Sequence, residues 1–482
     1  MEEQPLLAGE PDDIIKHHQA LHFNPNGDAK NPREWPLAYK YAVVLLLASM
    51  AFTVTFTCIS VVPLAGGIVQ DLDNGSSNPQ ASALLVTIWE LGEAAGPLLI
   101  APLSEVLGRY PVMNGCNIMF ILTTILASIS QSTKALIAMR ALTGLAVASN
   151  VLNPAIIGDM FESDHRGSAM SLVMLAPLIG GAVGPAISGT ISQTMGWRWV
   201  LYLAAGLATS CEILFLTCFH ETYSISILRQ RAQKLHLNSD EFPSAAKDEQ
   251  GAHKNVKKLW HSITRPLAVL FGSGVLLSLS FFGSINFSYF YVMSITLANI
   301  LKDIYGFSPA LTGSLFVFFS VGSFIGVLIC NVFLDKIYVK LRGDQKGKPE
   351  HRLPLAVIGA FALPLSLMMY GWTAHLHLPV PLLLASVSLL GLTLLLIMIP
   401  LSAYVVDAFG LFSASAMTGV IVTRCLMGTF LPLAASPLAQ RFGYGWGFTF
   451  LAMASLALAP IPVFILRYGY AWRQRGKFTR DV

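Results

Sequence analysis

The sequence predicts an all-α polytopic membrane protein in which twelve transmembrane helices form two pseudo-symmetric six-helix bundles. Three observations carry this prediction. The chain of 482 residues is 54% hydrophobic and 12% charged, with a mean hydropathy of +0.60, whereas soluble globular domains are typically about 25% charged. Apolar stretches long enough to cross a bilayer recur along its whole length. Residue patterns of the first half return in the second half.

Twelve apolar spans of roughly 20 residues, the length a helix needs to cross about 30 Å of hydrocarbon, follow one another along the chain. Their expected cores are 41–62, 82–101, 112–131, 135–157, 168–190, 198–219, 267–294, 310–334, 354–374, 380–405, 414–437 and 447–467. Residues 221–265, between the sixth and seventh spans, are polar. The start of this segment has apolar residues at helical spacing, which favours either an amphipathic helix on the membrane surface or a solvated tether.

The predicted organisation is an N-terminal tail (1–40), a first bundle (41–220), a linker (221–265), a second bundle (266–468) and a C-terminal tail (469–482). Of the Lys and Arg residues, 25 fall in the tails, linker and loops on one side of the membrane and four on the other. Because basic residues accumulate in cytoplasmic loops, both termini are expected in the cytoplasm. Asn74, in an Asn-Gly-Ser sequon, then lies in the first outer loop as a candidate N-glycosylation site.

An internal repeat connects the two halves. Three residues near the second span return 230 positions later: Gly92, Gly96 and Glu105 become Gly322, Gly326 and Asp335. A second set, which includes Asp159 and its counterpart Asp407, is displaced by 247 or 248 positions. Glycines four apart on one helix face allow a neighbouring helix to approach closely. Duplicated halves of this kind are common in transporters.

A short charged turn follows the second span. Glu105 and Arg109 flank Gly108 there, at the cytoplasmic mouth of the first bundle. This arrangement suits a conformational latch, and the alternative is an ordinary loop. The second half has no Gly-Arg after Asp335, so only the first half is expected to carry the full latch.

Five ionisable residues lie inside the predicted spans, where charges are unfavourable and usually functional: Glu90, Glu93, Arg140, Glu212 and Arg424. Glu90 and Glu93 share a helix face. The depths of Glu90 and Arg140 differ by only ~5 Å at 1.5 Å per residue, which allows an ion pair. Two interpretations stay open: fixed pairs that hold helices together, or groups that handle protons or substrate.

The fifth span is rich in residues that bend a helix or allow close packing, namely Gly180, Gly181, Gly184, Pro185 and Gly189. Such residues are tolerated in a spanning helix where neighbours cover the backbone. This helix should therefore pack tightly against a partner. Glycine-rich spans are also common in membrane proteins, which is the alternative interpretation.

The six cysteines lie inside apolar spans without a CxxC pair, and they are interpreted as small hydrophobic residues. No cluster of nucleophile, base or metal ligands is evident in the sequence. We therefore expect no enzymatic activity, no cofactor and no metal site.

These motifs resemble the major facilitator superfamily, and within it the fungal branch of the twelve-spanner drug:proton antiporter family. APLSEVLGRYPV (101–112) is similar to the superfamily's signature loop, with Glu105 where most members have aspartate. Arg140 with Gly144 resembles the helix-4 motif, and GAVGPAISG (181–189) resembles the helix-5 antiporter motif. Further similarity to the fungal branch is found in NPREW (31–35), WRW (197–199), HETY (220–223) and YVVDAFG (404–410) with Arg424. The resemblance covers nearly the whole chain and implies the major facilitator fold.

The resemblance implies a proton-coupled antiporter that exports a small, largely apolar organic compound, such as a drug, a toxin or a secondary metabolite. The alternative is a proton-coupled uptake permease for a small organic solute. Deleting an exporter causes hypersensitivity, whereas deleting a permease impairs growth on a nutrient. A receptor-like membrane sensor is a further alternative, but it would need a large signalling tail, which is not expected in this chain. The expected partners are the substrate, protons and the lipid bilayer, without nucleic acid, and the chain is expected to act as a monomer.

The family arrangement implies that Arg109 pairs with Asp159 at cytoplasmic helix ends and latches the outward-facing state. Glu105 is expected to face the N-terminal end of the eleventh span, where free backbone N–H groups favour an anion by about 0.3–1 kcal/mol. Aromatic residues of the seventh and eighth spans are candidates to line a midplane pocket: Phe281, Phe282, Phe287, Tyr289, Phe290, Tyr291, Phe316, Phe318 and Phe319.

Glu90, Glu93 and Glu212 do not belong to the family-wide motifs, so their role is inferred from the residues alone. A carboxylate that meets water in one state and apolar walls or a guanidinium in another changes its proton affinity. The sequence therefore predicts that proton coupling depends on at least one of these acids, with Arg140 as the switchable partner. Glu90 and Glu93 lie nearer Arg140 in depth, and Glu212 is the alternative site for a cationic substrate.

The N-terminal tail carries an acidic dileucine pattern, EEQPLL (2–7). By resemblance such a signal diverts membrane proteins to the vacuole, so the plasma membrane is the expected location and the vacuolar membrane the alternative. Replacing Leu6 and Leu7 together by alanine is expected to shift any vacuolar share of a fluorescently tagged chain to the plasma membrane. An unchanged distribution in live-cell imaging would mean that the signal is idle.

Overall fold

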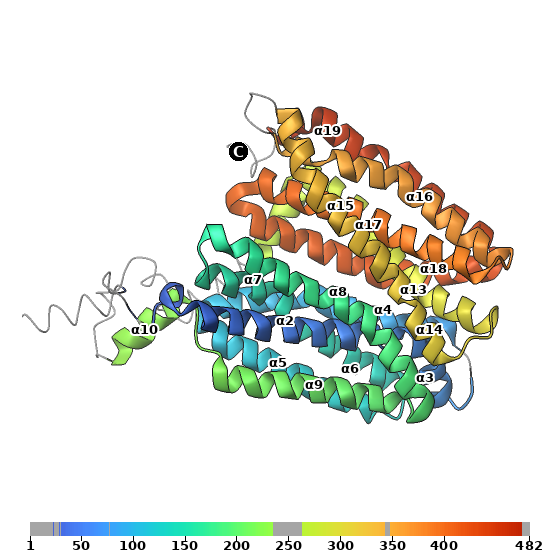
Figure 1. Ribbon diagram of the computed structural model, residues 1–482, viewed down its shortest axis with the longest axis horizontal. Coiled ribbons are helices and arrows are strands. Elements are labelled where there is room, and N and C mark those ends of the chain that lie inside the picture. The colour runs from blue at the N-terminus through green and yellow to red at the C-terminus, as the bar shows by residue number, and fades with distance from the viewer. Residues whose placement is uncertain are drawn as a thin grey trace, which may run out of the picture.

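Twelve apolar helical spans, 20 to 36 residues long, make up the computed structural model (Figure 1). The structure describes residues 30–76, 78–234, 263–342 and 348–474, together with Phe23 and Asp28, and these residues contain no strand. The predicted all-α fold with twelve membrane-spanning helices is confirmed. The dileucine pattern at 2–7 and the linker residues 235–262 lie outside the described ranges.

The first six spans form one bundle, which begins after a short turn, η1 (Pro32–Glu34). Its helices are α2 (Leu37–Ile59), η2 (Val62–Leu64), α3 (Ala65–Leu72), α4 (Pro79–Leu107), α5 (Arg109–Ser128), α6 (Thr133–Leu145), α7 (Ser149–Met160), α8 (Ser163–Thr194) and α9 (Trp197–Cys218). Breaks inside the first and fourth spans separate α2 from α3 and α6 from α7. The linker begins as a helix, α10 (Ser224–Lys234).

The last six spans form the second bundle. Its helices are α13 (Gly274–Asp303), α14 (Pro309–Leu315), α15 (Val317–Arg342), η4 (Pro349–Arg352), α16 (Pro354–His375), α17 (Val380–Phe409), η5 (Gly410–Phe412), α18 (Ser413–Leu458) and α19 (Pro460–Arg473). The eleventh and twelfth spans meet inside α18 at Gly443, whose φ of +73° a residue with a side chain rarely adopts.

The seventh span begins at Gly274, later than the expected residue 267. Ser273 explains the difference, because its side chain accepts a hydrogen bond from the backbone N–H of Leu276 and so caps α13. The preceding apolar residues form a separate short helix, Ile263–Gly272. The side chains of Asn78 and Ser132 cap α4 and α6 in the same way.

Both bundles use the same helix pairings. In the first bundle, α2 packs on α8, α4 on α6, and α5 on α9. The helices at the same places in the second bundle repeat these contacts: α13 packs on α18, α15 on α17, and α16 on the twelfth span, where Tyr370 meets Phe448. The pseudo-symmetry predicted from the sequence repeat is therefore confirmed.

The repeated glycines mark the closest helix crossing in each bundle. A Cβ on Gly92 would overlap the carbonyl oxygen of Ala141, and a Cβ on Gly322 would overlap that of Ser388. The helices α4 and α6, and likewise α15 and α17, thus touch backbone to backbone, as small residues permit within a membrane. Similar approaches to carbonyl oxygens are made by Gly96 to Leu145, Gly144 to Trp89, Gly326 to Leu392 and Gly391 to Phe319.

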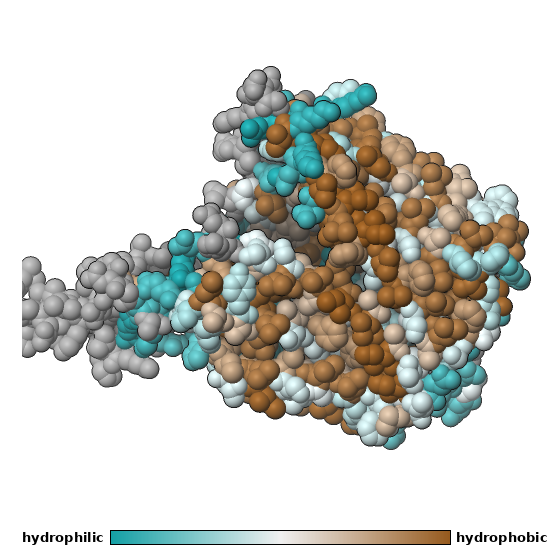
Figure 2. Space-filling view, in the orientation of Figure 1, coloured by the Kyte–Doolittle hydropathy of each residue, from teal (hydrophilic) through white to brown (hydrophobic). Residues whose placement is uncertain are grey.

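The two bundles have distinct ends. We call the end where α2 begins and α9 ends the tail side, and the end that carries α3 and α14 the far side (Figure 1). Hydrophobic residues cover the flanks of both bundles, and hydrophilic residues gather at the two ends (Figure 2). This distribution matches a protein whose middle lies in hydrocarbon.

Two seams join the bundles, one between α8 and α14 and one between α4 and α18. On the far side, Gly313 lies on the carbonyl of Pro185, and Gly189 lies on that of Pro309. Side-chain hydrogen bonds and ion pairs between the bundles include those of Thr87, Glu90 and Glu93 of α4 with the second bundle. The contacts found between the bundles therefore extend from the middle of α4 to the far side.

Filling the close crossing in the second bundle is expected to destabilise the fold. Gly322→Leu would force α15 away from α17, and overpacking of this kind costs roughly 1–3 kcal/mol or more. Gly206→Leu is the matched control, because a Cβ at Gly206 of α9 meets no atom within 4 Å. Thermal unfolding of the two purified variants in detergent should show a lowered midpoint for the first alone, and equal midpoints would contradict the assignment.

Candidate functional site

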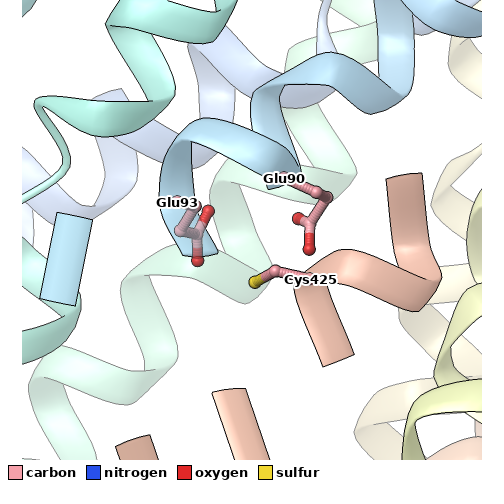
Figure 3. Close-up of side chains that lie close together, drawn as sticks. All are labelled: Glu90, Glu93 and Cys425. Carbon is pink, nitrogen blue, oxygen red and sulfur yellow. The ribbon is translucent and has the colours of Figure 1, made fainter. Parts of the chain in front are cut away.

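Glu90 and Glu93 are buried on one face of α4, where this helix faces α18 and α13 (Figure 3). They are 4% and 7% exposed. Glu90 Oε1 accepts a hydrogen bond from the hydroxyl of Tyr291 on α13. Glu90 Oε2 is buried and has no hydrogen-bond partner among the described residues. Glu90 thus joins the two bundles through one oxygen and leaves the other unused.

Glu93 is bonded mainly within its own bundle. It accepts hydrogen bonds from Nε1 of Trp89 at 3.2 Å and from Nδ2 of Asn150 at 2.6 Å. Its Oε1 also lies 3.9 Å from Nη2 of Arg424 on α18, which is a long ion pair across the seam. Groups of the first bundle therefore hold Glu93 in place by hydrogen bonds, whereas the second bundle contributes only the guanidinium of Arg424 at a longer distance.

Arg424 has bonding capacity that this conformation does not use. Its guanidinium carbon lies 4.6 Å from the centre of the Phe287 ring, and its side chain is 29% exposed. Its Nε is buried without a hydrogen-bond partner among the described residues. Arg424 is therefore not fixed to one partner by a full set of hydrogen bonds.

Arg140 does not pair with Glu90 or Glu93 in this conformation, which differs from the ion pair considered in the sequence. Its Nη1 and Nη2 donate to the carbonyls of Thr57 and Cys58 at 3.0 Å each, and its Nε donates to Leu85. The helix α2 ends at Ile59, so its last carbonyls lack intrahelical partners and are free to accept. Arg140 holds three helices of one bundle together.

Glu212 lies apart from the other two acids. It accepts a hydrogen bond at 2.8 Å from Nδ2 of Asn117, between α9 and α5, and is 4% exposed. The seam between α4 and α18 contains Glu90 and Glu93 but not Glu212. Of the three acids predicted as coupling candidates, Glu90 and Glu93 thus lie between the two bundles, and Glu212 lies inside the first bundle.

Four of the predicted pocket aromatics gather beside Arg424 and Glu90. Phe290 lies 4.8 Å from Phe319 and 5.0 Å from Tyr291, measured between ring centres, and Phe287 lies 6.1 Å from Tyr291. Phe282, Tyr289 and Phe316 are instead buried in the core, and Phe281 and Phe318 are exposed at 43% and 38%. Phe287, Phe290, Tyr291 and Phe319 thus form the aromatic group nearest the buried charges.

The structure brings Arg109 and Asp159 together at the tail side, with Nε and Oδ2 3.4 Å apart. Nη1 of Arg109 also donates to the hydroxyl of Ser104, and its guanidinium carbon lies 4.6 Å from the centre of the Tyr223 ring. The geometry of the expected pair is thus present, whereas its role as a latch stays a prediction.

Glu221 contacts the Arg109 region and was missed by the sequence analysis. Its carboxylate accepts hydrogen bonds from the backbone N–H groups of Arg109 and Tyr110 at 2.8 and 3.1 Å, at the start of α5. These first N–H groups of a helix have no intrahelical partner and favour an anion. Gly108, with φ +102°, lets the chain turn against this carboxylate. The HETY segment (220–223) could have pointed to it.

Glu105 is exposed at the end of α4. No hydrogen bond or ion pair joins it to a described residue, and the expected contact with the start of α18 is not made in this conformation.

The second bundle has its own ion-pair network, contrary to the expectation that only the first half carries a full latch. Arg352 of η4 bonds to Asp335 at 2.5 Å and to Asp407 at 2.9 Å. Burial lowers the pKa of an arginine, but the hydrogen bonds from these aspartates outweigh that effect and raise the pKa of Arg352. The arginine comes 17 positions after Asp335, so a search for Gly-Arg directly after the acid could not find it.

The glycines of α8 face two different partners. A Cβ on Gly180 would come within 2.8 Å of the carbonyl oxygen of Phe52, and Gly184 lies against Phe56, both on α2. Gly189 and Pro185 meet α14 at the far-side seam, while Gly181 has room for a side chain. The predicted tight packing is therefore present at four of these five positions.

Asn74 is exposed in the loop between α3 and α4 at the far side, with φ +54°. Its glycosylation remains a prediction.

Comparison with known proteins agrees with this architecture. The chain matches the Major Facilitator Superfamily over residues 42–432. "Efflux pump radE" of Floropilus chiversii is 32% identical over 421 residues, which cover 86% of this chain and 78% of that one. "MFS-type transporter penM" of Penicillium rubens is 32% identical over 444 residues, 91% and 86% of the two chains. The crystal structure of a D-xylose-proton symporter superposes with a TM-score of 0.66 at 14% identity, covering 89% and 98%.

Two repeated six-helix bundles around buried charges define a multi-pass membrane transporter. The chain belongs to the major facilitator superfamily, and the resemblance seen in its motifs is confirmed.

The pair at the tail side is expected to be required for transport. Asp159→Asn leaves the buried guanidinium of Arg109 uncompensated, and Arg109→Ala leaves the half-buried carboxylate of Asp159 without its partner. Both variants should reach the membrane and lose roughly 5–150-fold in transport rate, the range to which a coupling of about 1–3 kcal/mol corresponds.

Arg198→Ala is the control for the loss of a charge, because Arg198 pairs with Asp71 in an exposed pair at the far side. Transport assays should show near-normal rates for this variant. Wild-type transport rates for Arg109→Ala or Asp159→Asn would contradict the prediction that this pair acts as a latch.

Proposed function

We propose that this chain is a proton-coupled antiporter that exports a small, largely apolar organic compound by alternating access. The observation that carries the proposal is the cluster of Glu90, Glu93, Tyr291 and Arg424, in which titratable groups of one bundle are bonded to groups of the other. The name of one relative, an efflux pump, supports export over uptake.

The tail side is proposed to face the cytoplasm. The distribution of 25 against four basic residues in the loops supports this orientation. The present conformation, joined at the far side, then corresponds to an inward-facing state. Because Arg109 already contacts Asp159 here, that pair alone does not distinguish the states. We assign to Glu105 the contact that forms when the tail side closes, at the start of α18.

The charge balance of the cluster provides the coupling. Two carboxylates and one guanidinium leave one uncompensated negative charge, and burying such a charge is unfavourable. One proton shared by Glu90 and Glu93 would neutralise the cluster. When α18 moves relative to α4, Arg424 and Tyr291 leave the carboxylates, and the carboxylates then exchange protons with the other side of the membrane. Proton movement and bundle movement are linked in this way.

The aromatic wall determines the kind of compound that fits. Phe287, Phe290 and Phe319 offer ring faces and edges next to Glu93 and Arg424. Flat apolar bodies pack well on such surfaces. A largely apolar compound with a small polar group suits the site.

Removing the titratable proton is expected to uncouple the transporter. Glu90→Gln and Glu93→Gln, alone and together, should abolish export driven by a pH gradient while substrate binding and counterflow remain, because glutamine keeps the shape of the side chain. The assay is accumulation in proteoliposomes, with a compound to which a deletion strain is hypersensitive.

Glu212→Gln is the control, since Glu212 lies away from the seam, and it should retain pH-driven export. If the double Glu90/Glu93 variant still concentrates the compound with normal pH dependence, the coupling site lies elsewhere.

A further inference from the structure

The cluster at the seam contains a thiol besides its carboxylates. Sγ of Cys425 on α18 and one carboxylate oxygen each of Glu90 and Glu93 on α4 lie within 4.8 Å of one another (Figure 3). All three residues are buried, and Cys425 is 0% exposed. Glu90 Oε2 has no hydrogen-bond partner among the described residues. Among these residues this is the one group of three acidic, thiol or imidazole ligands that converges so closely.

We propose that Cys425, Glu90 and Glu93 form a binding site for a soft divalent cation such as Zn²⁺ or Cd²⁺. Thiolates select such metals over Mg²⁺ and Ca²⁺, which prefer sites made only of oxygen. Zinc bonds of about 2.3 Å to sulfur and 2.0–2.2 Å to oxygen place tetrahedral ligand atoms about 3.6 Å apart. The three ligand atoms lie within 4.8 Å of one another, so their separations need to shorten by only about 1 Å to hold Zn²⁺. The larger Cd²⁺ requires less movement.

The existing hydrogen bonds are compatible with a bound metal. A carboxylate oxygen has two lone pairs, so Glu93 can ligate a metal while Trp89 and Asn150 continue to donate to it. Tyr291 can likewise stay on Oε1 of Glu90 while Oε2 binds. These donors would then orient the ligands, as outer partners do in other metal sites.

The charges also balance. The deprotonated ligands carry three negative charges, which a divalent cation and the Arg424 guanidinium neutralise together. Binding therefore releases the thiol proton of Cys425 and the proton shared by Glu90 and Glu93, so that one cation replaces two protons. Arg424, 3.9 Å from Glu93, compensates the additional charge of the thiolate and is not an obstacle. The side chain of Arg424 is 29% exposed, so a cation can approach the site beside it.

A metal at this site would connect α4 of the first bundle to α18 of the second. Movement of the bundles past each other would require breaking metal bonds, so the cation should inhibit transport. This consequence rests on the proposed function, whereas binding of the metal does not.

The binding test uses the purified full-length chain in detergent, titrated with Cd²⁺ and followed by the ultraviolet absorption of the cadmium–thiolate bond and by the thermal unfolding midpoint. The expected result is one Cd²⁺ per chain, an unfolding midpoint that rises with Cd²⁺, and reversal by a chelator. Mg²⁺ should have no effect.

Variants identify the ligands. Cys425→Ser should remove the cadmium–thiolate absorption and weaken binding at least about tenfold, since even outer-shell changes cost 10–100-fold in other metal sites. Glu90→Gln should weaken binding while the protein keeps its fold. Cys330→Ser is the matched control, because Cys330 is buried on α15 against Leu395, and it should bind as the wild type does. Equal binding by the Cys425→Ser and wild-type chains would overturn the proposal.

Transport measurements separate this inference from the proposed function. Cd²⁺ should inhibit the wild-type and Cys330→Ser chains at the concentrations at which it binds, with each variant normalised to its own uninhibited rate. Cys425→Ser should require at least about tenfold more Cd²⁺. If Cd²⁺ binds with the expected ligands but leaves transport unchanged, the movement of α18 past α4 is contradicted, whereas absence of binding overturns only the metal site.

Discussion

A charged side chain inside the hydrocarbon region must find its partners within the protein, since lipid supplies none. Glu90, Glu93 and Arg424 meet this constraint across the seam between the two bundles. Separating the bundles would take Tyr291 and Arg424 away from these carboxylates, although Glu93 would keep Trp89 and Asn150. The proposed link between the charge state of the seam and the position of the bundles rests on this constraint.

Arg140 meets the same constraint in another way. Its guanidinium donates to free carbonyls at the end of α2 and lies 5.0 Å from the centre of the Trp89 ring. These partners all belong to the first bundle, so they move together with Arg140. The hydrogen bonds of Arg140 in this conformation thus stay within one bundle, whereas Arg424 contacts Glu93 across the seam. A role of Arg140 in proton coupling stays a prediction.

The sequence was sufficient for the spans and the repeat, because hydrocarbon thickness imposes a length and duplicated helix crossings need glycine at the same places. It could not determine which buried charges meet. Depth below the membrane surface places Glu90 near Arg140, but the direction in which a side chain points around its helix depends on packing register. Glu93 and Arg424 come from spans more than 300 positions apart, and no local pattern relates them. Arg352 could not be predicted for a different reason. It lies 17 positions after Asp335, and the two residues meet only because the chain folds back at η4.

The backbone-to-backbone crossings also determine where the molecule can deform. Where Gly92 lies on Ala141 and Gly322 on Ser388, no side chain stands between the helices, so no rotamer change can let one slide past the other. Each bundle is mechanically stiff for this reason. The seam between α4 and α18 instead contains the long side chains of Glu90, Glu93 and Arg424, whose torsions can absorb displacement. Backbone contacts of the same kind fix the far-side seam, where Gly313 lies on Pro185 and Gly189 on Pro309, so compliance between the bundles is left to the α4–α18 seam where the charges meet.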